Sequence, residues 1–320
     1  FIRREGRPTD EAILSGRIVD RTIRPLFDQH IRHEVQVVLT VLSIDEDDPD
    51  IISVIAASLA LGTSDIPWNG PVSAIRVSKN EGFHINPNYA QREEANISFD
   101  LVACGKDGLI NMIEVEGKEV AEDEVNKALA KASEEIEKIQ AWQQDIISKI
   151  GKAKKTIEKP QLTPGTEELF ASEITPKLSD YVFSGPCKEK MAEVVAIWMK
   201  LFKEKFPEGN KALAEEYLDE KINELLHKEA IENDKRADGR KMDEIRPLYV
   251  KAGGISPILH GSGIFYRGAT HILSALTLGG PGDAQVMDGM EVHEEKRFMH
   301  HYNFPPFSTG ETGRIGGTNR

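Results

Sequence analysis

Apolar residues recur at helical spacing in three places within the first 150 residues. The first predicts a helix over 11–24, with Thr9 as its N-cap. The second, over 51–61, is almost continuously apolar and follows Asp50, which is predicted to cap it. The third places apolar residues along one side of 121–150, as expected for a long amphipathic helix.

Between these helices the pattern changes to short β-branched and apolar runs that are typical of strands. The longest run covers 35–44, and its lack of polar alternation predicts a strand buried on both faces. Shorter runs, bounded by Gly, Asn and Pro, predict four more strands at 72–77, 83–85, 97–103 and 109–115.

The pattern changes again after residue 150. Two prolines and several lysines make 152–164 a predicted linker. Residues 166–235 are rich in Glu, Lys and Ala and have helical periodicity throughout. Beyond them, glycines separate apolar runs that predict strands, including 271–278 and 297–302. The order is therefore an α+β part, an all-α part and a second β-rich part.

Composition narrows the class of protein. Hydrophobic residues are 39% and charged residues 29%, as in an ordinary soluble globular protein. The net charge of −13 excludes a uniformly basic nucleic-acid-binding surface but not a local basic patch. No apolar run reaches the roughly 18 residues of a membrane span, and no signal peptide is evident. Because the chain begins at Phe1 and stops at Arg320 after a Gly-rich stretch, we expect an internal fragment of a longer protein.

Two cysteines, Cys104 and Cys187, lie far apart in the sequence. They make no disulfide framework, so we expect reduced thiols and a cytoplasmic location.

Arginine is concentrated in the first 33 residues. Arg17, Arg21 and Arg24 are spaced i, i+4 and i+7, so they share one face of the predicted helix. A guanidinium donates two parallel hydrogen bonds to phosphate oxygens, and three on one face can follow a phosphodiester backbone. The alternative is a solvated face on which nearby acids neutralise the arginines. Those acids are Asp10, Asp20 and Asp28.

Other chemical motifs are weak. The acidic run at 45–50 lacks the Gly and Glu positions of a calcium loop, so it is predicted to be a solvated loop. His300 and His301 would point to opposite faces of a strand, which disfavours joint metal binding. Glycines between 310 and 317 form a loop that either holds phosphate beside Arg314 and Arg320 or is a plain turn.

Five long stretches carry more information than their composition. They are FIRREGRPTDEAILSGRIVDRTIRPLF (1–27), PDIISVIAASLALGTSDIPWNGP (49–71), ADGRKMDEIRPL (237–248), HGSGIFYRGATHILSALTLGGPGDAQ (260–285) and RFMHHYNFPPFSTGETGRIGGTNR (297–320). Taken in this order, they resemble the bacterial polynucleotide phosphorylase family. The first two are similar to its first core, the next two to the start of its second core, and the last to the loop before the second core's active-site helix.

The resemblance implies an α+β fold with two tandem RNase PH-like cores (ribosomal protein S5 domain 2-like) joined by an all-α domain. It implies that 1–150 is the C-terminal part of the first core and 151–165 a linker. Residues 166–235 would then be the all-helical domain, and 236–320 the N-terminal part of the second core. Both cores are expected to be incomplete. The family assembles as a homotrimeric ring around an RNA channel.

The implied reaction is 3′-to-5′ phosphorolysis of single-stranded RNA by inorganic phosphate, giving nucleoside diphosphates reversibly. Mg²⁺ would neutralise charge that develops on the transferred phosphoryl group. The resemblance places the catalytic residues and the Mg²⁺ ligands outside this chain, so the isolated chain is expected to be inactive. It also implies membership of an RNA-degradation complex in mRNA turnover. The alternative is a non-catalytic RNA-binding ring or scaffold component.

Residue by residue, the resemblance implies two RNA contacts and one substrate contact. A constriction loop that grips single-stranded RNA matches Phe1, Arg3, Arg4 and Arg7. Ile2 stands where the family usually has Phe, so base stacking there rests on Phe1. The arginine helix of the first core matches Arg17, Arg21 and Arg24. Arg320 matches the first of the arginines that contact phosphate and substrate in the second core.

Overall fold

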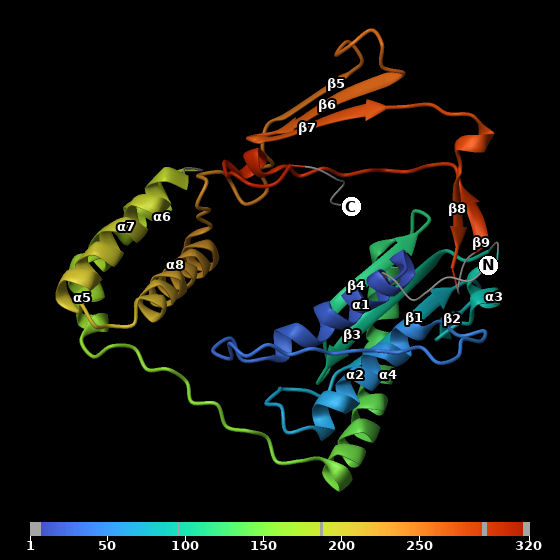
Figure 1. Ribbon diagram of the computed structural model, residues 1–320, viewed down its shortest axis with the longest axis horizontal. Helices are drawn as coiled ribbons and strands as arrows, with labels where there is room; N and C mark the ends of the chain where they lie inside the picture. The colour runs from blue at the N-terminus through green and yellow to red at the C-terminus, as the bar shows by residue number, and fades with distance from the viewer. Residues whose placement is uncertain (1–7, 95, 186–187, 290–292, 316–320) are drawn as a thin grey trace. The chain divides into compact units, whose positions relative to one another are not determined.

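The structure is a computed structural model that describes residues 8–315 apart from 95, 186, 187 and 290–292 (Figure 1). Its internal contacts divide the chain into two units, 1–158 with 281–320, and 159–280.

Residues 8–158 form a four-stranded antiparallel sheet with the strand order β2-β1-β3-β4 and with helices on both faces (Figure 1). Helices α1 and α2 cover one face, and α4 covers the other. The elements in chain order are α1 (Asp10–Ile23), α2 (Pro49–Thr63), β1 (Ser73–Lys79), β2 (Phe83–Ile85), α3 (Tyr89–Arg92), β3 (Phe99–Lys106), β4 (Leu109–Gly117) and α4 (Glu122–Ile150).

Alternation along the two central strands of this sheet builds two hydrophobic cores. In β3, Val102 and Cys104 face α1 and α2, whereas Leu101 and Ala103 face α4. All four side chains are buried, because the sheet is covered on both faces. The sheet therefore holds α1, the helix of the predicted arginine face, in a fixed position.

Caps set the starts of the first two helices. Thr9 caps α1 as predicted, since its hydroxyl oxygen accepts a hydrogen bond from the backbone N–H of Ala12 at 3.2 Å. The predicted cap of α2 at Asp50 is wrong. Asp48 caps that helix, and Pro49 occupies the first helical position. A proline is favoured there because it has no backbone N–H that would need an acceptor.

The predicted buried strand at 35–44 is also wrong. This run has no strand assignment, and most of its side chains are exposed, including Leu42 at 93%. Only Val37 packs against the core under α1 and α2. A β-branched run favours extended backbone, but a strand also needs a neighbouring strand, and the described residues supply none here.

No helix or strand occurs between 151 and 165, a segment that the structure describes completely. The helical segment that follows packs around the fully buried rings of Trp198 and Phe202. Its helices are α5 (Thr166–Glu173), α6 (Thr175–Val182), α7 (Lys188–Lys205) and α8 (Lys211–Asn233).

Two small antiparallel sheets follow in the described part of the chain. One has the strand order β5-β6-β7, and the other is the hairpin β8-β9. The predicted strand at 271–278 is confirmed as β7, but the one at 297–302 is wrong, because the last strand ends at Lys296. The strands are β5 (Leu248–Ala252), β6 (Gly261–Arg267), β7 (Thr270–Leu276), β8 (Gln285–Asp288) and β9 (His293–Lys296).

An ion pair ties the start of α4 to the sheet and gives a pH-dependent prediction. Hydrogen bonds from Lys127 and from Lys79 of β1 lower the pKa of Glu124 to about 2, from an ordinary value of 4.5. A lowered pKa in the folded state stabilises the fold above pH 4.5, and this stabilisation is lost as the pH falls from 4.5 towards 2. Glu124→Gln should therefore lower the Tm at pH 7 and leave it unchanged near pH 2.

The matched control is Glu122→Gln, which removes a carboxylate from the same first turn of α4. Glu122 forms no ion pair with any residue in the described ranges. Thermal unfolding followed by circular dichroism at both pH values measures the difference between the two variants. An equal loss of Tm by Glu124→Gln at pH 7 and pH 2 would contradict the ionic origin.

Candidate nucleic-acid interface

The three arginines predicted to share a helix face lie along α1 and the 3-10 turn that follows it. Arg17 and Arg21 belong to α1, and Arg24 begins the turn Arg24–Leu26. All three are exposed, with side-chain exposure of 50% for Arg21 and 71% for Arg24. The structure thus brings this part of the predicted site together at the surface.

Two of these arginines have acidic partners. Arg24 Nε donates to Asp20 Oδ1 at 2.9 Å, one of the acids predicted as an alternative partner. Arg21 Nη1 donates to Glu114 Oε1 of β4 at 3.2 Å. Arg17 makes no ion pair with any residue in the described ranges. Exposed pairs of this kind contribute little stability, so both arginines can exchange a carboxylate for a phosphate at low free-energy cost.

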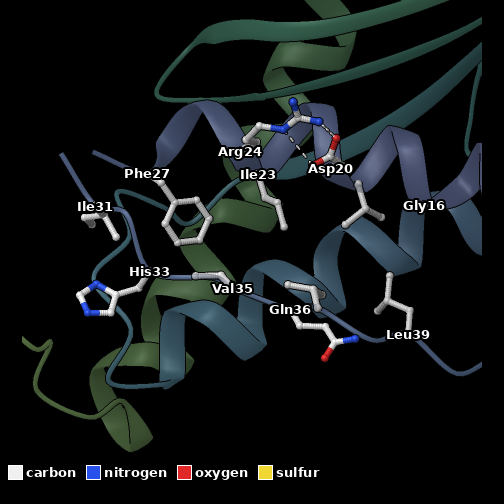
Figure 2. Close-up of a pocket in the computed structure, with 12 residues that line it drawn as sticks. Gly16, Asp20, Ile23, Arg24, Phe27, Ile31, His33, Val35, Gln36 and Leu39 are labelled. Atoms are coloured by element: carbon white, nitrogen blue, oxygen red, sulfur yellow. Dashed lines mark hydrogen bonds and ion pairs between the residues drawn. The ribbon is translucent and has the colours of Figure 1, made fainter. Parts of the chain in front are cut away.

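A groove of about 460 Å³ runs between α1 and the segment 31–39 (Figure 2). Ile23, Phe27 and Val35 give it apolar walls. In Figure 2 the ion pair of Arg24 with Asp20 lies along the helix side of the groove. Asp20, Arg24, His33 and Gln36 also line the groove, so its lining is mixed rather than a cationic anion site.

The other predicted site residues lie outside the described residues. They are Phe1, Arg3, Arg4, Arg7 and Arg320. Cys187 also lies outside them.

A second set of charges was not predicted as a cluster. Arg76 of β1 is 7% exposed and lies on the α1–α2 side of the sheet. Its Nη1 donates to Asp100 at 2.8 Å, and its Nη2 lies 2.6 Å from Asp48 and 3.1 Å from Asp50. Arg92 contacts two of the same carboxylates, Asp48 at 2.6 Å and Asp100 at 3.1 Å. Two guanidiniums therefore share three carboxylates.

This network corrects part of the prediction that the acidic run at 45–50 is a solvated loop, because residues 45–47 are exposed whereas Asp48 and Asp50 are not. Asp48 and Asp50 have side-chain exposures of only 7% and 17%. Burial is the main cause that raises the pKa of Asp50, and the neighbouring carboxylate of Asp48 raises it further. The only signal in the sequence is the single charged residue, Arg76, inside an otherwise uncharged stretch of strand.

The acidic and thiol groups of the described residues show no metal-ligand set and no activated cysteine. No group of three or more His, Cys, Asp or Glu side chains in the described ranges is placed to hold a metal ion. Arginine nitrogens already contact the oxygens of the buried aspartates. Burial raises the pKa of the Cys104 thiol to about 12, so this cysteine stays protonated and is not a nucleophile at neutral pH.

The fold and the match to a family model define the class of protein. Residues 1–67 match the model of the 3′ exoribonuclease family, domain 1. Together with the helix-covered antiparallel sheet, this match identifies an α+β, RNase PH-like fold. None of the described helices has an apolar stretch long enough to cross a bilayer.

Relatives extend the similarity to the whole chain. It is 41% identical over 325 residues to the polyribonucleotide nucleotidyltransferase of Heliobacterium modesticaldum, covering 100% of this chain and 45% of that protein. The enzymes of the same name from Anoxybacillus flavithermus and Thermus thermophilus are 42% and 40% identical, again over 100% of this chain and 46% of each relative. The chain spans about half the length of these relatives. It is a homologue of the polyribonucleotide nucleotidyltransferases, as the resemblance predicted.

Proposed function

We propose that the protein that contains this chain is a polyribonucleotide nucleotidyltransferase that degrades RNA from its 3′ end by phosphorolysis. The similarity of the whole chain, at about 40% identity, to enzymes of that name carries the proposal. The match of residues 1–67 to the 3′ exoribonuclease family supports the direction of attack.

In this reaction an oxygen of inorganic phosphate attacks the phosphorus of the last phosphodiester. The bond from that phosphorus to the O3′ of the preceding ribose breaks, and a nucleoside diphosphate leaves. Mg²⁺ is the proposed metal and would neutralise charge on the transferred phosphoryl group. In line with the resemblance, its ligands are proposed to lie outside this chain.

This chain is proposed to contribute RNA contacts through its arginines. Arg17, Arg21 and Arg24 form an exposed cationic face on a helix that the sheet holds in place. The constriction-loop residues and Arg320 complete the proposed contacts. We further propose a cytoplasmic homotrimer that joins an RNA-degradation complex.

The test is phosphate-dependent release of ADP from poly(A), in the presence of Mg²⁺, by the protein as its source genome encodes it. We expect ADP release by that protein, and none above a no-protein control by the 320-residue chain alone. If the encoded protein binds RNA but releases no ADP, the proposed activity is wrong and an RNA-binding scaffold takes its place. Turnover by the chain alone would place a catalytic set within it.

Removing the cationic face should change how RNA binding depends on salt. Each phosphate contact with single-stranded RNA contributes roughly 0.7 to the slope of log K against log salt concentration. Arg17→Gln with Arg24→Gln should therefore lower that slope by about 1.4 and weaken binding without base preference. Fluorescence anisotropy of labelled oligo(A) from low to moderate salt measures it.

The control removes two exposed cations from α4, on the other side of the sheet, by Lys138→Gln with Lys149→Gln. Both double variants change the net charge equally, so long-range attraction is matched. Identical slopes for the two would rule out a local RNA contact at α1.

A further inference from the structure

A row of three rings crosses the β5–β6–β7 sheet. Tyr249, Tyr266 and His271 are partners in the strand register, so they project from the same face. The Tyr266 and His271 rings stack with centroids 3.9 Å apart and planes at 26°, and Tyr249 follows at 5.5 Å from Tyr266. The rings are thus already aligned across all three strands.

Both ends of this row are open. β5 and β7 are the outer strands of the sheet, and no other described strand pairs with either of them. Tyr249 is 52% exposed, and His271 is also exposed. A planar group can therefore continue the stack beyond His271 or beyond Tyr249 without displacing backbone.

The charge around the row favours an anion. Residues 245–282 contain no Asp or Glu, although the whole chain carries a net charge of −13. The three cations of this stretch are Arg246, Lys251 and Arg267. Lys251 lies two positions from Tyr249 on the same strand, so it shares the face of the rings. Arg267 directly follows Tyr266 on β6, so strand alternation places it on the opposite face, together with its register partner Thr270, to which Arg246 Nη1 donates at 3.4 Å.

The opposite face of the sheet has a different character. Val250, Phe265 and Ile272 are register partners there and form a purely apolar row. An apolar partner would pack on that face. A ring stack next to Lys251, in a stretch without acidic residues, instead matches a ligand with planar groups and negative charges along one chain, which is the chemistry of single-stranded RNA.

We propose that the face carrying Tyr249, Tyr266 and His271 is a stacking site for unpaired RNA bases. The proposal rests on the proposed function only in taking RNA as the ligand. A base continues the ring stack at its open end, while a flanking phosphate lies towards Lys251. Every base has a planar face, so binding is independent of sequence, and paired bases are excluded because they are already stacked.

The test compares Tyr249→Ala with His271→Ala against a control on the opposite face, Val250→Ala with Ile272→Ala. Both pairs lie on the same two outer strands, β5 and β7. Val250 and Ile272 directly follow Tyr249 and His271, so they point to the opposite face. For the 320-residue chain and labelled oligo(A), the ring variant should raise the Kd roughly 10- to 100-fold and leave the salt slope unchanged. The variant Tyr249→Phe with His271→Phe should restore binding, because it keeps the rings.

A direct readout accompanies the affinities. An oligonucleotide carrying 5-iodouridine, irradiated in complex with the wild-type chain, should form crosslinks that mass spectrometry locates at Tyr249, Tyr266 or His271. Circular dichroism checks that all variants keep their secondary structure.

The outcomes separate this site from the proposed function. Unchanged affinity in the ring variant, with weakened binding in the α1 arginine variant, overturns the stacking site and leaves the proposed function standing. Equal weakening by the ring variant and the opposite-face control also overturns it. Failure of the wild-type chain to bind oligo(A) overturns the stacking site, while ADP release by the encoded protein tests the proposed function separately.

Discussion

Replacing Arg76 with methionine is expected to lower the free energy of unfolding of the 8–158 fold by about 3–5 kcal/mol. Methionine replaces the aliphatic part of the arginine side chain but provides no charge. Three carboxylates would then share the single remaining guanidinium of Arg92 in a largely buried space. Breaking a buried ion network in this way leaves charge without compensation, which is far more destabilising than loss of an exposed pair.

The matched control is Arg24→Met, which removes an exposed arginine from its pair with Asp20. Its expected loss is at most about 1 kcal/mol. Hydrogen–deuterium exchange of β1 and β3 peptides at increasing urea concentrations reports on this unit alone. Similar losses of unfolding free energy in the two variants would mean that the buried network stabilises the fold no more than an exposed ion pair does.

The pH dependence of the Arg76→Met deficit has a defined sign. Without the guanidinium, which lowers the pKa of Asp50, burial should raise that pKa further in the folded state. A raised folded-state pKa means that the protein is most stable below the unfolded pKa, near 4, and loses stability as the pH rises. The deficit should therefore be largest at pH 7 and should shrink as the pH falls towards 4. Asp50 already has a raised pKa in the intact network.

This network marks the limit of what sequence patterns predict. The helices at 11–24 and 121–150 could be predicted because their periodicity is local. Arg76 could be recognised as unusual in an uncharged run, but its partners lie 24 to 28 positions away. The fold alone brings Asp48 and Asp100 to it. The same reasoning explains the error at 35–44, where strand propensity is local but strand pairing is not.

The features of the candidate sites also divide into those that local spacing predicts and those that only the fold creates. The shared face of Arg17, Arg21 and Arg24 follows from helical spacing and was predictable. The contact of Arg21 with Glu114 could not be predicted, because it depends on where β4 passes α1. The ring row of the β5–β6–β7 sheet was missed because only the strand register reveals that Tyr249 and His271 lie on one line.

The second large effect is expected in the helical segment, at Trp198. This side chain is fully buried, and its indole Nε1–H donates to the backbone oxygen of Ala214 at 2.7 Å. Its ring meets Phe170 edge-on at 5.0 Å and lies 5.8 Å from Phe202. It therefore joins α5, α7 and α8 through one residue.

Trp198→Ala should lower the free energy of unfolding of this helical segment by about 3–5 kcal/mol, because it leaves a cavity between three helices and removes a buried hydrogen bond. Trp198→Phe keeps most of the ring volume but not the donor, so its loss should be smaller. Trp142→Ala is the matched control, since that ring is 52% exposed on α4. Its effect should stay within about 1 kcal/mol.

Thermal unfolding at 222 nm, with hydrogen exchange of α7 and α8 peptides, measures these changes. If Trp198→Ala accelerates exchange in α7 and α8 but not in β1 and β3, the helical segment unfolds separately from the first sheet. Equal acceleration in both places would instead mean that the two are energetically coupled. A loss no greater than that of Trp142→Ala would contradict the assignment of Trp198 as the residue that joins these helices.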